Sequence, residues 1–135
     1  MINSIIEIFI YCVLAHYIAD YILQTPFIAK FKCKESWEKE YPDELYKNDY
    51  KVVLWTHSIC WSIVTFLPLY LMADVAAWQY LVIILTQAWC HSIVDDGKAN
   101  DHIFSLKGDQ IIHLIQIIVM VLTYTILWFF IKILI

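Results

Sequence analysis

The chain has 135 residues, of which 61% are hydrophobic and 16% aromatic, and its mean hydropathy is +0.65. A soluble domain of this length cannot bury so much apolar surface, so the composition excludes an ordinary soluble protein and indicates that most of the surface faces lipid. The net charge of −4, without a concentrated basic groove, excludes nucleic acid as a partner.

Four apolar segments are long enough to cross a bilayer core, which requires about 20 residues per helix. They predict helices at about 2–24, 52–72, 75–95 and 109–135, in a single domain that covers residues 1–135. The first segment lacks the basic start and the small-residue cleavage site of a signal peptide, so we expect it to remain as a helix. The predicted fold is therefore all-α, an integral membrane bundle of four transmembrane helices.

The first loop, residues 26–50, is amphipathic and charged. Lysine and glutamate alternate there with aromatic residues such as Phe27 and Trp37. This pattern predicts an interfacial helix from Phe27 to Trp37, whose basic residues would contact anionic lipid head groups. A solvated helical linker fits the same residues equally well.

The placement of lysine predicts the orientation of the bundle. The chain has no arginine, and eight of its nine lysines lie in or directly beside the loops 26–50 and 96–108. By the positive-inside rule both loops are cytoplasmic and both termini lie outside, in a multi-pass protein of the inner or plasma membrane. The lipid bilayer is then the main partner, and so small a unit is also compatible with a homo-oligomer.

Ionisable residues within the predicted helices are unusual, because each costs at least a few kcal/mol in a membrane. Three His/Asp pairs are spaced four residues apart, and side chains at that spacing share one face of a helix. With His57, the pairs reach the same end of an alternating bundle. The seven candidate metal ligands are His16, Asp20, His57, His91, Asp95, Asp109 and His113.

Each pair alone is also explained by a local hydrogen bond that hides a carboxylate and an imidazole from lipid. Convergence of all of them favours a metal site, because imidazole and carboxylate are the donors that zinc, manganese and iron prefer. Seven ligands are more than one tetrahedral zinc needs. We therefore predict one or two divalent ions.

The ordered motifs resemble a known family. The set His16-x3-Asp20-x3-Gln24, His57, His91-x3-Asp95-x2-Lys98 and Asp109-Gln110-x2-His113 resembles the small bacterial and phage membrane proteins grouped as domain of unknown function 3307. The resemblance covers nearly the whole chain, and it implies no activity because the family has none established.

A weaker resemblance links Thr56-His57-Ser58 to membrane-bound metal-dependent hydrolases, in which a Thr-His-Ser motif opens a helix. The His-Arg pair of that family is missing, since this chain has no arginine. The resemblance raises the expectation of hydrolysis only slightly.

The leading hypothesis is a metal-dependent hydrolase that acts on a phosphoester or lipid-linked substrate, a lipid or a phosphorylated small molecule, at the cytoplasmic face. Asp96, or an aspartate of the ligand set, would be the general base. Lys98 would bind the substrate phosphate or stabilise developing negative charge, and Gln24 and Gln110 would orient ligands or substrate.

Two alternatives remain. The same residues serve a divalent-cation or proton transporter or channel subunit, or a structural or regulatory membrane protein. The outer half of the predicted bundle has few polar residues, among them Glu7 and Thr65, whereas a permeation path should continue to the far side. This favours a one-sided site.

Overall fold

The computed structural model describes residues 2–134, and every regular element in this range is helical. The first long element is α1 (Ile2–Tyr17), which continues into a π-helical turn, η1 (Ile18–Ile22). The other long helices are α4 (Asp49–Met72), α5 (Ala77–Ala99) and α6 (Leu106–Leu134). Two short helices, α2 (Pro26–Phe31) and α3 (Lys34–Glu40), and a 3₁₀ turn, η2 (Glu44–Tyr46), connect η1 to α4. The predicted all-α fold is confirmed.

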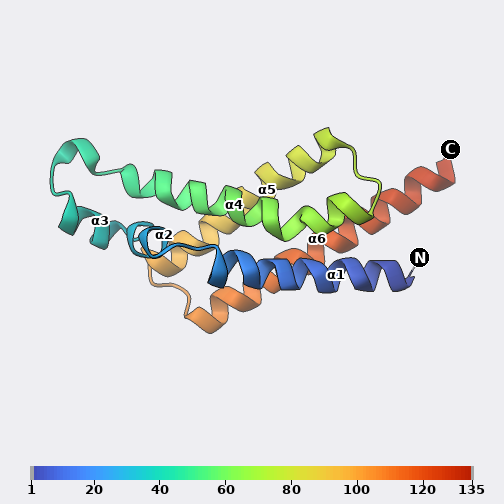
Figure 1. The fold of residues 1–135 in the computed structure, drawn as a ribbon, viewed down its shortest axis with the longest axis horizontal. Helices are drawn as coiled ribbons and strands as arrows, with labels where there is room; N and C mark the ends of the chain where they lie inside the picture. Colours follow the sequence, from blue (N-terminus) through green and yellow to red (C-terminus); the bar gives the residue numbers. More distant parts are fainter. Residues whose placement is uncertain (1, 135) are drawn as a thin grey trace.

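The four long elements alternate in direction along the bundle (Figure 1). Both termini and the turn between α4 and α5 lie toward one end, whereas α2, α3 and the connection between α5 and α6 lie toward the other. Each long helix packs against the next one along the chain, α1 against α4, α4 against α5 and α5 against α6. Residues at the α2 end of each helix are therefore brought together.

Three helical stretches are long and apolar enough to cross a membrane, namely Ser4–Ile22, Glu44–Met72 and Leu106–Leu127. The fourth long helix, α5, is not among them; it carries polar residues at intervals, including Gln79, Gln87 and Asp95. By length and composition, the structure thus supports three of the four predicted spans.

The helices end at different residues from those expected from hydropathy. α4 begins at Asp49 instead of residue 52, α5 covers Ala77–Ala99 instead of 75–95, and α6 begins at Leu106 instead of residue 109. Hydropathy marks the apolar part of a helix, whereas backbone hydrogen bonding continues into polar turns at its ends. The turn added to α5 matters, because Lys98 lies in it.

The apolar core fills the bundle between the polar end and the termini. Trp61, Phe66, Leu69, Ile117 and Cys12 are at most 1% exposed and belong to one packed cluster. Pro68 lies inside α4 without ending it, as expected for a helix packed against neighbours. The outward faces of all four long helices are covered by exposed large apolar residues.

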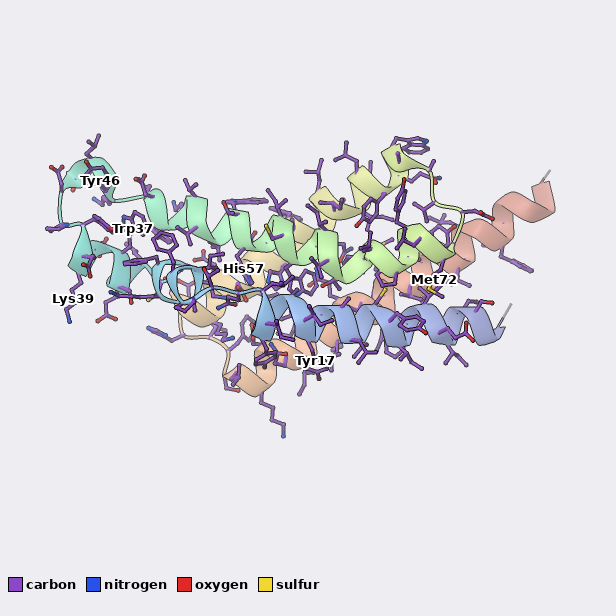
Figure 2. All side chains as sticks on the ribbon, in the orientation of Figure 1. Tyr17, Trp37, Lys39, Tyr46, His57 and Met72 are labelled. Carbon is purple, nitrogen blue, oxygen red and sulfur yellow. The ribbon has the colours of Figure 1, made fainter. Side chains whose placement is uncertain are left out.

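The first loop is a folded cap instead of one amphipathic helix. The helix predicted from Phe27 to Trp37 is divided into α2 and α3, with Lys32 and Cys33 between them. The aromatic side chains pack against one another, since the ring centroids of Phe31 and Trp37 are 5.4 Å apart and those of Trp37 and Tyr41 are 4.9 Å apart. Figure 2 shows Trp37 and Tyr46 together at this end of the molecule, and the Trp37 indole donates a hydrogen bond to the Tyr46 carbonyl.

Candidate metal centre

All four long helical elements contribute to a buried polar cluster at the capped end. Asp20 comes from η1 and His57 from α4, His91 and Asp95 come from α5, and Asp109 and His113 come from α6. The last five residues are at most 3% exposed, and the side chain of Asp20 is 10% exposed. In Figure 2, His57 lies near the end of α4 that faces α2, far from Met72 at the other end of the helix.

The π-helical turn η1 positions Asp20. A π turn inserts one extra residue into a helical turn, which changes the direction of the side chains that follow; such turns are frequent at functional sites. Here Ala19 is buried, and Asp20 Oδ1 lies 3.7 Å from His57 Nε2. The hydropathy pattern contains no signal for this turn.

His57 and His91 face each other through their Nε2 atoms, which are 3.3 Å apart. Zinc–nitrogen bonds of about 2.0–2.1 Å at a tetrahedral angle hold two donor nitrogens about 3.3–3.4 Å apart. Two imidazole lone pairs at this distance repel each other unless a proton or a cation lies between them. The spacing therefore suits two ligands of one ion.

Aromatic stacking holds His91 in place. Its ring stacks on Trp61, with centroids 4.0 Å apart, and on His113, with centroids 4.2 Å apart, and the Trp61 and His113 rings are themselves 5.4 Å apart. The Trp61 indole N–H also donates to His16 Nδ1 over 2.9 Å. Trp61 thus fixes the orientation of two histidines, and it is not among the predicted site residues.

Asp95 is paired with a lysine from the first loop. Lys32 Nζ donates to Asp95 Oδ2 over 2.5 Å and to Gln24 Oε1 over 3.4 Å, and Lys32 is only 7% exposed. The same carboxylate oxygen lies 3.4 Å from His57 Nε2 and 3.7 Å from His91 Nε2. Lys32 therefore brings a positive charge from the cap directly to the cluster.

Asn100 holds this part of the cap against α5. Its side chain accepts a hydrogen bond from the Lys34 backbone N–H over 2.7 Å and donates to the Lys32 carbonyl over 3.3 Å. It also donates to Asp96 Oδ1. The Asp96 carboxylate thus orients Asn100, and the described contacts do not bring it to the cluster.

His16 is fully buried, but both of its ring nitrogens are already hydrogen bonded. Nδ1 accepts from Trp61, and Nε2 lies 3.1 Å from Gln110 Oε1. The Gln110 amide in turn donates to Asp20 Oδ2 over 3.1 Å and to Asp109 Oδ2 over 3.2 Å. His16 acts here through Gln110, which connects two carboxylates of the cluster.

Asp109 lies between Lys98 and His113. Lys98 Nζ donates to Asp109 Oδ2 over 2.6 Å, and His113 Nε2 lies 3.2 Å from Asp109 Oδ1 and 3.5 Å from Asp95 Oδ1. Lys98 thus brings a positive charge directly against the Asp109 carboxylate.

Several buried atoms of the cluster lack a hydrogen-bond partner within the described part of the chain, among them Asp20 Oδ1, Asp109 Oδ1 and His113 Nε2. Buried polar atoms are nearly always satisfied, so each such atom needs an explanation. Two groups have donor atoms close enough together to hold an ion, Asp20/His57/His91 and His91/Asp95/His113. An ion in either group would satisfy atoms that are otherwise unpaired.

Residues 8–134 match a family model described as a protein of unknown function, DUF3307. The chain belongs to the DUF3307 family. No curated protein and no solved structure matches it.

For this DUF3307 protein, the structure brings six of the seven predicted ligands into one cluster and places His16 behind it. Gln110 lies within the cluster, whereas Gln24 reaches it only through Lys32. Lys98 contacts Asp109, and Asp96 contacts Asn100. The sequence pattern did not predict two residues at the cluster, Lys32 and Trp61, or Asn100, which holds the Lys32 segment against α5. The repeated lysines of the first loop were the only signal for Lys32.

Proposed function

We propose that this protein is a membrane-embedded hydrolase that uses a single divalent metal ion on a phosphoester at the cytoplasmic face. The observation that carries the proposal is the Asp20/His57/His91 group, in which His57 Nε2 lies 3.3 Å from His91 Nε2 and 3.7 Å from the unpartnered Asp20 Oδ1. Two imidazoles and one carboxylate form a ligand set that leaves coordination positions open for water and substrate.

In this proposal α5 is the fourth transmembrane helix. It carries a face of large apolar side chains that no other part of the described chain covers, including Trp78, Leu81, Leu85 and Trp89, each at least 55% exposed. In water such a face would be costly, whereas lipid accommodates it. Its buried polar residues, such as Gln87 and His91, lie toward the other helices.

The Asp20/His57/His91 group is a better ligand set than His91/Asp95/His113. Lys32 already engages Asp95 Oδ2. His113 Nε2 lies nearer to Asp109 Oδ1, at 3.2 Å, than to Asp95 Oδ1, at 3.5 Å, and Asp109 is outside this group. Both groups need His91, and the lone pair of one imidazole nitrogen binds one ion.

The charges of the cluster also favour one ion over two. Asp20, Asp95 and Asp109 supply negative charge, and the ammonium groups of Lys32 and Lys98 offset most of it. One divalent cation gives a modest positive excess that suits an anionic substrate. A second would leave a large uncompensated charge in a buried site, which is costly.

Asp20, His57 and His91 would hold the ion, which when bound would lower the pKa of a coordinated water and polarise the phosphoryl group. Asp95, adjacent to the ligand imidazoles, takes the proton as the water oxygen bonds to phosphorus. The ester P–O bond breaks, and the proton passes to the departing alcohol oxygen. Lys32 and Lys98 stabilise the charge on the phosphoryl oxygens. Asp96, which orients Asn100, has no part in this scheme.

The interior beyond the cluster supports a one-sided site over a permeation path. Trp61 and Phe66 close the bundle below the histidines, and Leu69 and Ile117 continue the apolar core toward the termini. Among the described residues, a cation or proton would find hydroxyl and amide groups there, such as those of Thr65, Gln87 and Gln116, but no buried carboxylate or imidazole.

The proposal is tested with protein purified into phosphatidylcholine nanodiscs. After loading with Zn²⁺ or Mn²⁺, we expect release of inorganic phosphate from hexadecyl phosphate, loss of release after chelation, and recovery when the metal is returned. The His91→Ala variant should release none, and the variant of the exposed histidine, His102→Ala, should behave as wild type. Phosphate release that survives chelation, or its absence from metal-loaded wild type, would contradict the proposal.

The orientation of the site is tested at Cys33, which lies between Lys32 and Lys34 at the start of α3. A thiol beside positive charge is reactive where it is accessible. With Cys12, Cys60 and Cys90 replaced by alanine, an impermeant thiol reagent should leave Cys33 unmodified in intact cells and label it once the membrane is opened.

The matched control places a single cysteine at the exposed Ser4, near the N-terminus, by Ser4→Cys in a chain without other cysteines. This cysteine should be labelled in intact cells. The reverse pattern at the two positions would place the site on the outer face.

A further inference from the structure

A second feature adjoins the cluster from the lipid-facing side of the bundle. A cavity of about 280 Å³ lies between η1, α2 and α4. Its walls are mainly apolar and include Leu23, Ile28, Ile63 and Val64, and its inner residues are His57 and Trp61. None of the roles assigned so far uses this space.

The cavity leads from the outer surface to the interior. Leu23 is 53% exposed and Ile63 is 40% exposed, so these walls reach the face that would contact lipid. The inner residues His57 and Trp61 are 3% and 1% exposed. An alkyl chain could therefore pass from the bilayer to the edge of the cluster without crossing water.

His57 joins the cavity to the proposed ion. The same side chain lines the cavity and places Nε2 3.3 Å from His91 Nε2 and 3.7 Å from Asp20 Oδ1. A molecule in the cavity would thus have an apolar part against Ile63 and Val64 and a polar end beside the ion and Lys32. This arrangement matches an amphiphile, with an uncharged chain and an anionic head.

We propose that this cavity binds the alkyl chain of a single-chain phosphate monoester, whose phosphate binds the ion at His57 and His91. The inference rests on the proposed function and names its substrate class. Charge complementarity selects an anionic head group. With the ion bound, the positive charges of the ion, Lys32 and Lys98 exceed the negative charges of the three carboxylates. The apolar walls select a chain over a sugar or nucleoside, whose hydroxyl and amide groups would be left without partners there.

A neighbouring groove supplies a control. It has a volume of about 530 Å³, lies between α1 and α4, and is lined by apolar residues such as Leu14, Leu67 and Leu71. It is larger, but no histidine or carboxylate lines it. Lipid chains should contact this groove regardless of their head group.

The experiment uses zinc-loaded protein in phosphatidylcholine nanodiscs and hexadecyl phosphate with a diazirine in its chain. After irradiation, cross-linked peptides are quantified by mass spectrometry, and the same chain on a phosphocholine head serves as the reference. For each probe, the labelling of the Leu23/Ile63 cavity is divided by the labelling of the Leu67 groove. This ratio should be about tenfold higher for the phosphate probe than for the phosphocholine reference, which corresponds to about 1.4 kcal/mol of head-group binding.

Two variants on α4 form a matched pair, because Ile63 and Leu67 are each 40% exposed. Ile63→Trp should fill the cavity and abolish the excess labelling, while zinc per chain stays at the wild-type level. Leu67→Trp should change neither. Excess labelling that is lost with Ile63→Trp alone supports the inference.

The outcomes separate this inference from the proposed function. If zinc binds and phosphate is released, but both probes label the cavity and the groove in the same ratio, the chain site is wrong and the hydrolase proposal stands. If wild type binds no zinc, both are wrong. Excess labelling that persists in Ile63→Trp also overturns the chain site.

Discussion

In the His91→Ala variant, divalent metal should bind at least about a hundredfold more weakly than in wild type, since even the loss of an outer hydrogen-bond partner of a metal ligand costs about 10–100-fold. His91 belongs to both groups of donors that could hold an ion, so no complete group remains without it. Elemental analysis of purified protein checks the result. Membrane insertion should be retained, because removal of a polar side chain makes α5 more apolar.

Two further variants identify the third ligand. Asp20→Asn should lose metal as His91→Ala does, whereas His113→Ala should keep most of it. The opposite result would assign the ion to the His91/Asp95/His113 group instead. The exposed His102 provides the control substitution, and equal metal content in wild type and His91→Ala would show that the cluster is no metal site.

Asp95→Asn should lower the free energy of unfolding by about 3–5 kcal/mol, the usual cost of removing one partner of a buried ion pair. The side chains of Lys32 and Asp95 are only 9% and 3% exposed, so the lysine would keep a buried and uncompensated charge. Equilibrium unfolding in mixed micelles with increasing sodium dodecyl sulfate measures the change.

The double variant Lys32→Met/Asp95→Asn should recover most of the stability lost in Asp95→Asn, because replacement of a buried charge by an apolar side chain of similar length removes the penalty. It should not recover phosphate release, since the proposed base is still missing. Asp101→Asn, at an exposed aspartate near the same end, should change stability by less than about 0.5 kcal/mol. If the double variant is no more stable than Asp95→Asn, the uncompensated charge of Lys32 is not the cause of the lost stability.

The regular part of the site was predictable because helices are periodic. The spacing of four residues predicts that His91 and Asp95 share one face of a helix. The alternating direction of the helices predicts that His57 and His113 reach the same end of the bundle. These two rules need only the hydropathy pattern and the residue spacing. They account for the convergence of the predicted ligands other than His16 and Asp20, since the direction of Asp20 also depends on the π turn η1.

The irregular part was not predictable from such rules. The position of Lys32 depends on how α2, α3 and Asn100 pack. This packing cannot be predicted from the periodicity of the sequence. Whether His16 is a ligand depends on the partners that occupy its two nitrogens, Trp61 and Gln110, which come from other helices. Likewise, Asp96 and Asp95 are neighbours in sequence, but consecutive residues on a helix point in different directions.

The two lysines at the cluster bear on how the protein matures. In a zinc finger the ion itself supplies the free energy of folding, so the chain is unfolded without it. Here the ammonium groups of Lys32 and Lys98 already balance Asp95 and Asp109. Under the proposed function, the ion would therefore not be needed for the helices to assemble, and it would be acquired by, and exchanged from, a bundle that is already folded.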